Sequence, residues 1–197
     1  MRRLCIISAG VMLLLFTACE RKKDTPEQPD TPVAHVPVQQ PEVPDSMLWG
    51  HLGEDTGMSA LQFITEAGDT LEVCRTSQYT GIDGVLLGEI RNYTDCFAMT
   101  LTEGNETLVT AINVTQLRQQ WHAGKVTMNI KDDGTVTGDD TPYNGWKLWN
   151  CHILLSSEQQ QEYGTVLRVD TMDIVRLDRD SLVIRDHVNR IQSFSAK

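Results

Sequence analysis

The histidines of the chain are the first candidates for acid–base or metal chemistry. His51, His122, His152 and His187 stand one to a segment, and no two of them are two or four residues apart. A zinc site built on a single strand or helix would show such a pair. The sequence also has neither a G-x-S-x-G elbow nor an S-x-x-K motif. We therefore predict no catalytic residue, although a pair that only the fold brings together stays open.

Clustered carboxylates are the second candidate for chemistry, because they can hold calcium. Two acidic clusters, residues 132–134 and 138–140, lie on either side of a three-residue stretch. A calcium-binding EF-hand loop needs acids at alternate positions, glycine at the sixth and glutamate at the twelfth, and that spacing is absent. Asp and Gly are also ordinary turn residues. We predict hairpin turns here, with no metal and no cofactor.

Cys19 is the residue with the most specific chemistry. It follows the string LLFTA, and together they resemble the bacterial lipobox, in which the cysteine is diacylated and becomes residue one of the mature protein. Arg2 and Arg3 precede an apolar run over residues 5–16, which is too short for a helix that spans a membrane. We predict a signal peptide over residues 1–18 and lipidation at Cys19. A plain signal peptide and an uncleaved anchor are the alternatives.

The charge balance excludes some classes of partner. The formal charge is −10, and it becomes −12 without residues 1–18, which carry two arginines and no acid. Such a chain lacks the basic face that nucleic acid requires. The one basic run, residues 21–23, lies beside Cys19, where it can rest against lipid headgroups. We predict attachment through the N-terminal lipid to a membrane of the bacterial cell envelope, the outer one in preference to the inner.

Residues 19–46 form a linker by composition. Six of the seven prolines of the chain fall in it, and it has few large apolar side chains. Such a segment cannot bury enough surface to offset the entropy lost on ordering. We predict a lipidated, disordered stalk, which at about 3.1 Å per residue in polyproline geometry would reach roughly 80 Å.

From residue 47 onward the pattern is that of an all-β protein. Short apolar runs with period-2 alternation are separated by Gly, Asp and Asn turns, and we expect about ten or more strands in an antiparallel barrel, meander or sandwich. One segment differs, because Asn113 is a good N-cap and Gln116 follows three positions later. It predicts a two-turn helix over residues 113–121.

Three cysteines remain after residue 19, and their pairing is open. Cys74 and Cys96 lie opposite the apolar faces of their expected strands, and they would form one disulfide if those strands were neighbours. The alternative is that Cys74, Cys96 and Cys151 are three small, partly buried thiols.

Four strings in the second half resemble the lipocalin-like domains of lipoproteins from Bacteroidetes-type bacteria. They are INVTQLRQQW, VTMNIKDDGTVTG, YNGWKLWNCHILLSS and DTMDIVRLDRDSLVIRD, and the resemblance covers about residues 112–197. The strings LQFITEAGDTLEV and FAMTL resemble the smaller barrel-like module that often precedes such a domain. We therefore expect a small β-barrel-like module over residues 47–112 and a lipocalin-like β domain over residues 113–197.

The lipocalin resemblance implies an up-and-down antiparallel meander with its helix and Trp121 plugging one end. True lipocalins close eight strands around one small ligand. We count about six strands after Trp121. Either side chains fill this half-barrel, or it borrows strands from residues 47–112.

A ligand would then enter at the end of the barrel opposite the helix. We expect the loops over residues 79–84 and 139–145 to frame that opening, with Tyr79, Tyr143 and Trp146 as stacking contacts. Trp146 and Trp149 are three apart in one strand and so face opposite sides. Because these loops are acidic, we predict a neutral or apolar ligand.

The functional prediction is a membrane-anchored envelope lipoprotein that is not an enzyme. It would bind a small neutral or apolar ligand, a glycan or an envelope partner. The alternative is a hydrolase or isomerase acting on envelope glycans or lipids. Ser46, in Asp45-Ser46-Met47, resembles the O-glycosylation acceptor pattern of the same bacteria and is a candidate modification site.

Overall fold

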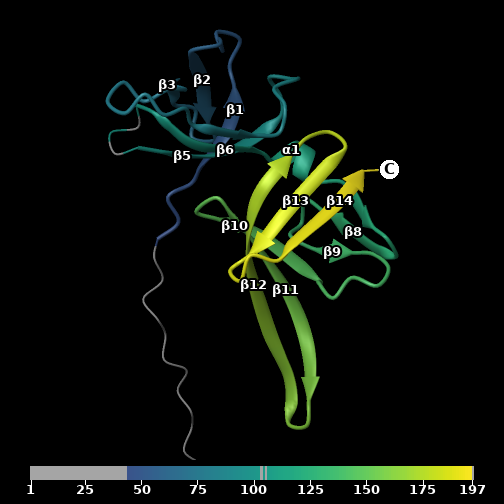
Figure 1. Cartoon of the computed structure of the whole chain (residues 1–197). Helices are drawn as coiled ribbons and strands as arrows, with labels where there is room; N and C mark the ends of the chain where they lie inside the picture. The colour runs from purple at the N-terminus through teal and green to yellow at the C-terminus, as the bar shows by residue number, and fades with distance from the viewer. Residues whose placement is uncertain (1–43, 103, 105, 197) are drawn as a thin grey trace, which may run out of the picture. The chain divides into compact units, whose positions relative to one another are not determined.

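The computed structural model describes residues 44–102, 104 and 106–196, which belong to one compact unit over residues 43–197. The predicted signal peptide, Cys19 and nearly all of the predicted linker lie outside the described residues. Within these residues the fold is all-β with one short helix, as the alternation predicted (Figure 1). No helix in the described part of the chain has the length and hydropathy to cross a membrane.

The first half forms a six-stranded sheet with the order β3-β2-β1-β5-β6-β4. All its pairings are antiparallel except that of β4 with β6. A parallel bridge between Cys74 and Thr107 joins the two sides of the sheet, so that it curls toward a small barrel. Its strands are β1 (Leu48–Leu52), β2 (Ala60–Thr65), β3 (Thr70–Cys74), β4 (Val85–Leu87), β5 (Cys96–Leu101) and β6 (Leu108–Asn113).

The second half forms an eight-stranded antiparallel sheet with the order β10-β11-β12-β13-β14-β7-β8-β9. Its two edge strands meet, because Trp146 donates its backbone N–H to the oxygen of Gly134 and Val136 donates to Asn144. The sheet is therefore a nearly closed barrel. Its strands are β7 (Gln120–Ala123), β8 (Val126–Ile130), β9 (Val136–Thr137), β10 (Gly145–Trp149), β11 (His152–Gln161), β12 (Gly164–Leu177), β13 (Ser181–Asp186) and β14 (Ile191–Ala196).

The expected half-barrel was wrong, because seven strands rather than about six follow Trp121, and together with β7 they make a barrel of eight that needs none from residues 47–112. WKLWNCHILLSS is two strands, since Asn150 and Cys151 adopt positive φ angles of 46° and 65° and reverse the chain. This is the backbone twist of a tight hairpin turn, adopted here without glycine. The two apolar runs TVLRV and DIVRL, which by pattern alone look like separate strands, are parts of one long strand, β12. The final strand, β14, was also missed, because the polar run IQSFSA has little apolar alternation.

The helix is shorter than the expected two turns. α1 covers Val114–Leu117, and the Asn113 side chain caps it by accepting a 2.9 Å hydrogen bond from the Gln116 N–H. Gln120 and Trp121 already belong to β7. The helix ends early because the barrel captures the backbone after it: Ile130 of β8 donates its N–H to the oxygen of Gln119.

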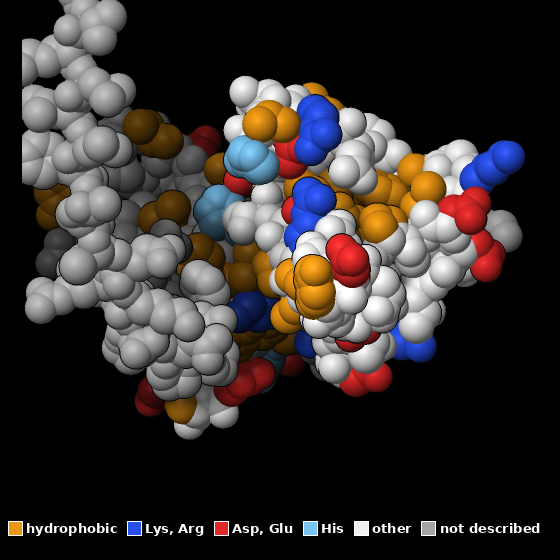
Figure 2. Space-filling view, turned by 90° about the horizontal axis from the view of Figure 1, so that it is seen from below, with side chains coloured by type: hydrophobic (Ala, Val, Ile, Leu, Met, Phe, Trp, Pro, Cys, Tyr) orange, Lys and Arg blue, Asp and Glu red, His pale blue; other side chains and the backbone are white. Residues whose placement is uncertain are grey.

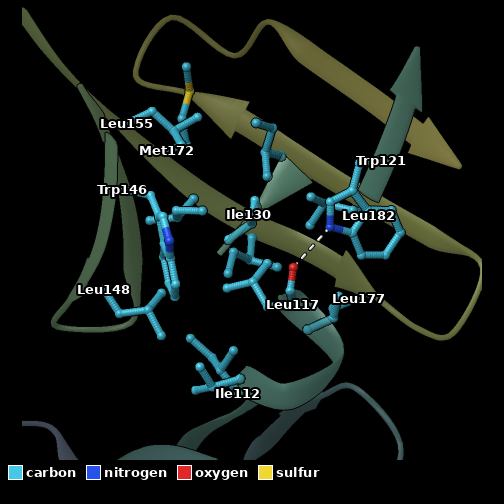
Figure 3. Packing of buried hydrophobic residues seen from close by; sticks show 14 of the residues in the cluster. Ile112, Leu117, Trp121, Ile130, Trp146, Leu148, Leu155, Met172, Leu177 and Leu182 are labelled. Carbon is cyan, nitrogen blue, oxygen red and sulfur yellow. Dashed lines mark hydrogen bonds between the residues drawn. The ribbon is translucent and has the colours of Figure 1, made fainter. Parts of the chain in front are cut away.

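Apolar side chains fill the barrel interior. Trp121 is fully buried there together with Ile130, Leu155 and Leu182, and Met172 lies at the edge of the same cluster (Figure 3). The indole of Trp146 is also buried, with Nε1 donating to the oxygen of Lys131 at 2.7 Å. The Arg118 guanidinium lies 5.8 Å from the centre of this indole, within cation–π range. A deep ligand cavity of the lipocalin kind is thus replaced by a packed core.

Residues of the six-stranded sheet close one end of the barrel. Met47, Leu87, Ala98 and Ile112 are buried in the same cluster as the barrel interior, and Figure 3 shows Ile112 beside α1 at the end where Leu148 lies. A second cluster, around Phe63 and Phe97, forms the core of the six-stranded sheet itself. The two halves are therefore packed against each other through a shared apolar layer.

The three cysteines of the described residues are free and partly buried. Cys74 is in β3 and Cys96 in β5, and β2 and β1 separate these strands. The condition for a disulfide between them, neighbouring strands, is not met. Burial raises the pKa of the Cys96 and Cys151 thiols, as expected for packing residues.

Candidate functional site at the barrel mouth

The barrel has one covered end and one open end. At the covered end, Gln119 donates its side-chain N–H to the oxygen of Arg179, in the turn that joins β12 to β13, and Gly88 of the first half donates to Leu177. The other end of β13 leads into residues 187–190, a turn at the opposite mouth. Two features frame that mouth: this turn, and the loop over residues 138–144 between β9 and β10.

A cavity of about 280 Å³ lies at the open mouth. Its walls come from the β9–β10 loop, from β12, and from the β13–β14 turn with the start of β14. Met172 and Tyr143 are buried and give it an apolar floor. The lining residues are Tyr143, Arg168, Asp170, Thr171, Met172, Asp186, His187, Arg190 and Gln192.

β11 and β12 extend beyond the mouth as a two-stranded hairpin that projects from the barrel (Figure 1). Residues 158–169 are exposed throughout, because none of the barrel strands covers them. Side chains alternate along a strand, so Asp170 and Arg168 share the face of Met172 that looks into the barrel. One face of the hairpin thus extends the cavity wall outward.

Tyr143 and Arg168 converge on Asp170. The Tyr143 hydroxyl donates to Oδ2 of Asp170 at 3.4 Å, and Arg168 Nε donates to Oδ1 at 2.9 Å. Burial, and then the negative charge of Asp170, raises the pKa of the Tyr143 phenol above its ordinary value of 10.0. The phenol is therefore a neutral hydrogen-bonding group at physiological pH.

Asp186 fixes the other wall of the cavity. Its side chain is only 5% exposed, and it accepts backbone N–H bonds from Val188 and Arg190 as well as a 2.6 Å bond from Arg190 Nε. Burial acts to raise the pKa of this carboxyl, but the hydrogen bonds from Arg190 and Val188 outweigh it, and the pKa lies below its ordinary value of 3.8. Asp186 is thus an ionised anchor for the Arg190 guanidinium.

The face around the hairpin carries both signs of charge. Figure 2 views this end of the barrel, and it shows Lys or Arg side chains next to Asp or Glu side chains, with apolar surface between them. In the cavity itself two arginines balance two aspartates. Such a site offers donors, acceptors and an apolar floor without a strong net charge.

The three residues predicted to contact a ligand lie in different places. Tyr143 lines the cavity, while Trp146 belongs to the barrel core and is not among the lining residues. Tyr79 is 93% exposed in the loop between β3 and β4 of the six-stranded sheet. Ser46 is exposed, and both its N–H and its hydroxyl donate to Oδ1 of Asn150 at 2.9 Å.

Sequence reasoning missed Arg168, Asp186 and Arg190. The signal for Arg168 was an Arg-x-Asp pair in a strand, which places both side chains on one face. The signal for the other two was Asp186 four positions before Arg190, with Asn189 between them at a φ of 63°. Asn tolerates such a backbone in tight turns. Neither signal reveals that the two arginines share a cavity.

Residues 132–134 form the turn of the β8–β9 hairpin, as predicted, whereas residues 138–140 begin the loop between β9 and β10. Asp133 accepts from both the N–H and the hydroxyl of Thr135, and the hydroxyl bond is the larger of the causes that lower the pKa of its carboxyl. No group of three or more His, Cys, Asp or Glu with metal-binding geometry occurs among the described residues.

A His–Asp pair lies outside the cavity, on the outer surface of the barrel. His152 Nδ1 is 2.8 Å from Oδ1 of Asp173, and Arg185 donates to Oδ2 of the same carboxylate at 2.9 Å. The Arg185 bond is the largest of the causes that lower the pKa of Asp173. Each of the three side chains is about two-fifths exposed, and none of them lines the mouth cavity.

A second hollow, of about 480 Å³, lies on the six-stranded sheet. His51, Glu54, Asp55, Gln62 and Tyr93 are among its lining residues. It lacks arginine, and it belongs to the half of the chain that precedes the barrel.

Comparison with known proteins shows what the barrel is similar to. Residues 112–197 match the model of the lipocalin-like family, so the C-terminal region is similar to lipocalin-like domains. The structure is similar to the crystal structure of a lipocalin-like protein from Bacteroides thetaiotaomicron. The match has 22% sequence identity and a TM-score of 0.35, and it covers 41% of this chain and 96% of the Bacteroides chain. No curated protein matches the sequence.

Proposed function

We propose that this chain is a lipid-anchored binding protein of the bacterial cell envelope that holds a glycan at the open mouth of its barrel. One observation carries the proposal, namely the mouth cavity with its apolar floor and its ring of fixed donors and acceptors. Sugars present both an apolar ring face and hydroxyl groups, and this combination meets such a lining well. The packed interior leaves the mouth as the place for a ligand.

The proposed anchoring is supported by the lipobox-like sequence before Cys19 and by the proline-rich linker after it. The two acyl chains of a diacylated cysteine meet what stable membrane attachment requires. We expect mass spectrometry of the membrane fraction to find a mature N-terminus at an acylated Cys19. Cys19→Ser should abolish the modification, whereas Cys5→Ser, in the segment that is removed, should leave it unchanged. An unmodified mature chain in the soluble fraction would contradict lipidation.

Glycan binding is testable on protein purified from its own host. Native mass spectrometry should find a retained molecule whose mass matches a glycan. Gln192→Trp should displace it, because residue 192 lines the cavity and indole would fill the space. Ser193→Trp is the matched control, since residue 193 is exposed on the same strand.

Two results would contradict the glycan proposal. One is a wild-type chain that retains no molecule and binds none of a panel of hexoses and uronates at millimolar concentration. The other is a retained molecule that both tryptophan variants keep. The latter would direct attention to the second hollow, with His51 and Tyr93.

The His152–Asp173 pair, joined at 2.8 Å, is the hydrogen-bonded His–Asp pair that the hydrolase or isomerase alternative could use. Neither residue of this pair lines the mouth cavity, and Arg185 already donates to the second carboxylate oxygen of Asp173. General acid–base catalysis requires a substrate held within hydrogen-bond reach of the pair. A binding role therefore fits the described residues better than catalysis.

A further inference from the structure

We infer that the glycan held at the barrel mouth carries a carboxylate, which Arg168 and Arg190 bind together. The inference rests on the proposed function and specifies its ligand class as an acidic sugar, a uronate. It also departs from the expectation of a neutral ligand, which followed from the acidity of the loops. The fold places two guanidinium groups in the cavity that the 138–144 loop and the 187–190 turn frame.

The argument starts from the way each guanidinium is hydrogen-bonded. Arg168 and Arg190 each donate to their aspartate through Nε. The terminal nitrogens of both groups make no hydrogen bond to any of the described residues. Their side chains are 53% and 73% exposed, so these nitrogens are accessible to a ligand. Two planar forks of N–H donors therefore remain available in one cavity.

A carboxylate is the group that fits such forks. Guanidinium binds carboxylate by two parallel hydrogen bonds, and these charge-assisted bonds are shorter and stronger than those between neutral groups. A single sugar hydroxyl lacks the second acceptor oxygen that the parallel pair of bonds requires. A uronate differs from its parent hexose by a carboxylate in place of the hydroxymethyl group. It can therefore form the paired guanidinium–carboxylate hydrogen bonds that the hexose cannot.

The aspartates hold the arginines in place for this task. Asp186 is buried and tied to two backbone N–H groups, so the guanidinium bonded to it is fixed relative to the turn. Asp170 is fixed in a similar way by the Tyr143 hydroxyl. Arginines already positioned lose less conformational freedom when a ligand binds, which favours affinity. The paired aspartates also keep the empty cavity close to neutral.

The spacing along β12 leaves room for a sugar ring. Met172 forms the floor, and Arg168 lies four residues further along the same face of the strand. At about 3.4 Å per residue, the two Cα atoms are roughly 14 Å apart. A ring resting on Met172 and Tyr143 would therefore direct a carboxylate toward the guanidinium groups at the rim.

The test is calorimetric titration of the full-length lipidated protein in detergent. The ligands are glucuronate and galacturonate, with glucose, galactose and glucuronamide as neutral counterparts. We expect at least one uronate to bind about tenfold or more tightly than its neutral counterparts, as charge-assisted hydrogen bonds imply. Raising the salt from 0.05 to 0.5 M should weaken uronate binding and leave hexose binding unchanged.

Arg168→Gln and Arg190→Gln should each remove most of the preference for the uronate. Arg176→Gln is the matched control, because Arg176 lies on the same strand as Arg168 and is bonded through Nε to Asp178, just past the end of that strand, but does not line the cavity. The salt dependence of the wild-type chain decides the question if a variant does not fold.

Each outcome bears on one of the two claims. Equal binding of uronates and neutral hexoses would overturn the carboxylate inference and leave the glycan proposal standing. A preference for the uronate that survives in both arginine variants would also overturn the inference. Failure of every sugar to bind would overturn the proposed function, and the inference with it.

Discussion

The indole N–H of Trp121 donates a 3.0 Å hydrogen bond to the carbonyl oxygen of Leu117 (Figure 3). This bond links the last residue of α1 to the first strand of the barrel, and both side chains are fully buried. The same oxygen also accepts the backbone N–H of Gln119. Trp121 is thus the largest fully buried side chain of the core, and its hydrogen bond also holds residues 117–121 at the covered end of the barrel.

Trp121→Phe should therefore destabilise the fold by about 1–3 kcal/mol, because it removes a buried donor and leaves unfilled space. Chemical denaturation followed by circular dichroism measures the change in unfolding free energy. Trp149→Phe is the control, since Trp149 is only partly buried and makes no side-chain hydrogen bond among the described residues. A cost for Trp149→Phe equal to that for Trp121→Phe would contradict the role assigned to Trp121.

Asn113 joins three segments by means of one buried amide. Its oxygen caps α1, and its nitrogen donates to the oxygen of Glu89 and to Asp95 Oδ2 at 2.8 and 2.9 Å. Asn113→Ala should cost about 2–3 kcal/mol, because it removes the cap and leaves buried partners without a bond.

Asn113→Asp gives a sharper test of the same network. It keeps the cap oxygen but sets a second carboxylate against Asp95. The loss of unfolding free energy should then shrink as the pH falls from 7 to 4, because protonation of one carboxyl removes the repulsion and restores a donor. Asn113→Ala should show no such change over this range. A pH-independent loss in the Asp variant would refute the contact with Asp95.

Asp186 should contribute to stability in a pH-dependent manner. The folded-state pKa of this carboxyl lies below 3.8, so its contribution is present above about pH 4 and is lost as the pH falls through the folded value. Urea denaturation between pH 6 and pH 2.5 should show a smaller acid-induced loss for Asp186→Asn than for the wild-type chain. Asp139→Asn, at an exposed position without a side-chain hydrogen bond among the described residues, should follow the wild-type curve.

The Tyr143 phenol should ionise at a higher pH than an exposed tyrosine. Its pKa is raised above 10.0 by burial and by Asp170, so its contribution to stability is intact below pH 10 and is lost above the folded pKa. Ultraviolet titration of the phenols should show a component above pH 10 that disappears in Tyr143→Phe. Tyr163→Phe, which alters a 95% exposed side chain at the hairpin tip, should leave that component in place. Its persistence in the Tyr143 variant would contradict the assignment.

Much of the fold could be predicted from the sequence, because it depends on local patterns. Period-2 alternation identified most strands, and Asn113 marked the start of the helix. The errors came from effects that the pattern does not contain. The reversal at Asn150 and Cys151 requires positive φ at residues other than glycine, and the early end of α1 is imposed by pairing with β8.

The site was harder to predict than the fold, because its members are distant in sequence. Tyr143 was found from loop composition, but Arg168 is carried by β12 and Arg190 by the turn between β13 and β14, and the two line one cavity only when the barrel closes. Tyr79 looked equivalent to Tyr143 by composition, yet it belongs to the other sheet. Trp146 was chosen as an exposed stacking residue, and the structure puts its indole in the core with a backbone partner for Nε1.

The apolar layer shared by the two sheets has a consequence for how the protein unfolds. Met47, Leu87, Ala98 and Ile112 come from the first half of the chain and cover the end of the barrel made by the second. A chain that began at residue 113 would leave that end open to water and lose its folding partner. We therefore expect residues 47–196 to melt in one cooperative transition. The sequence boundary near residue 112 thus divides two architectures that share a single folding unit.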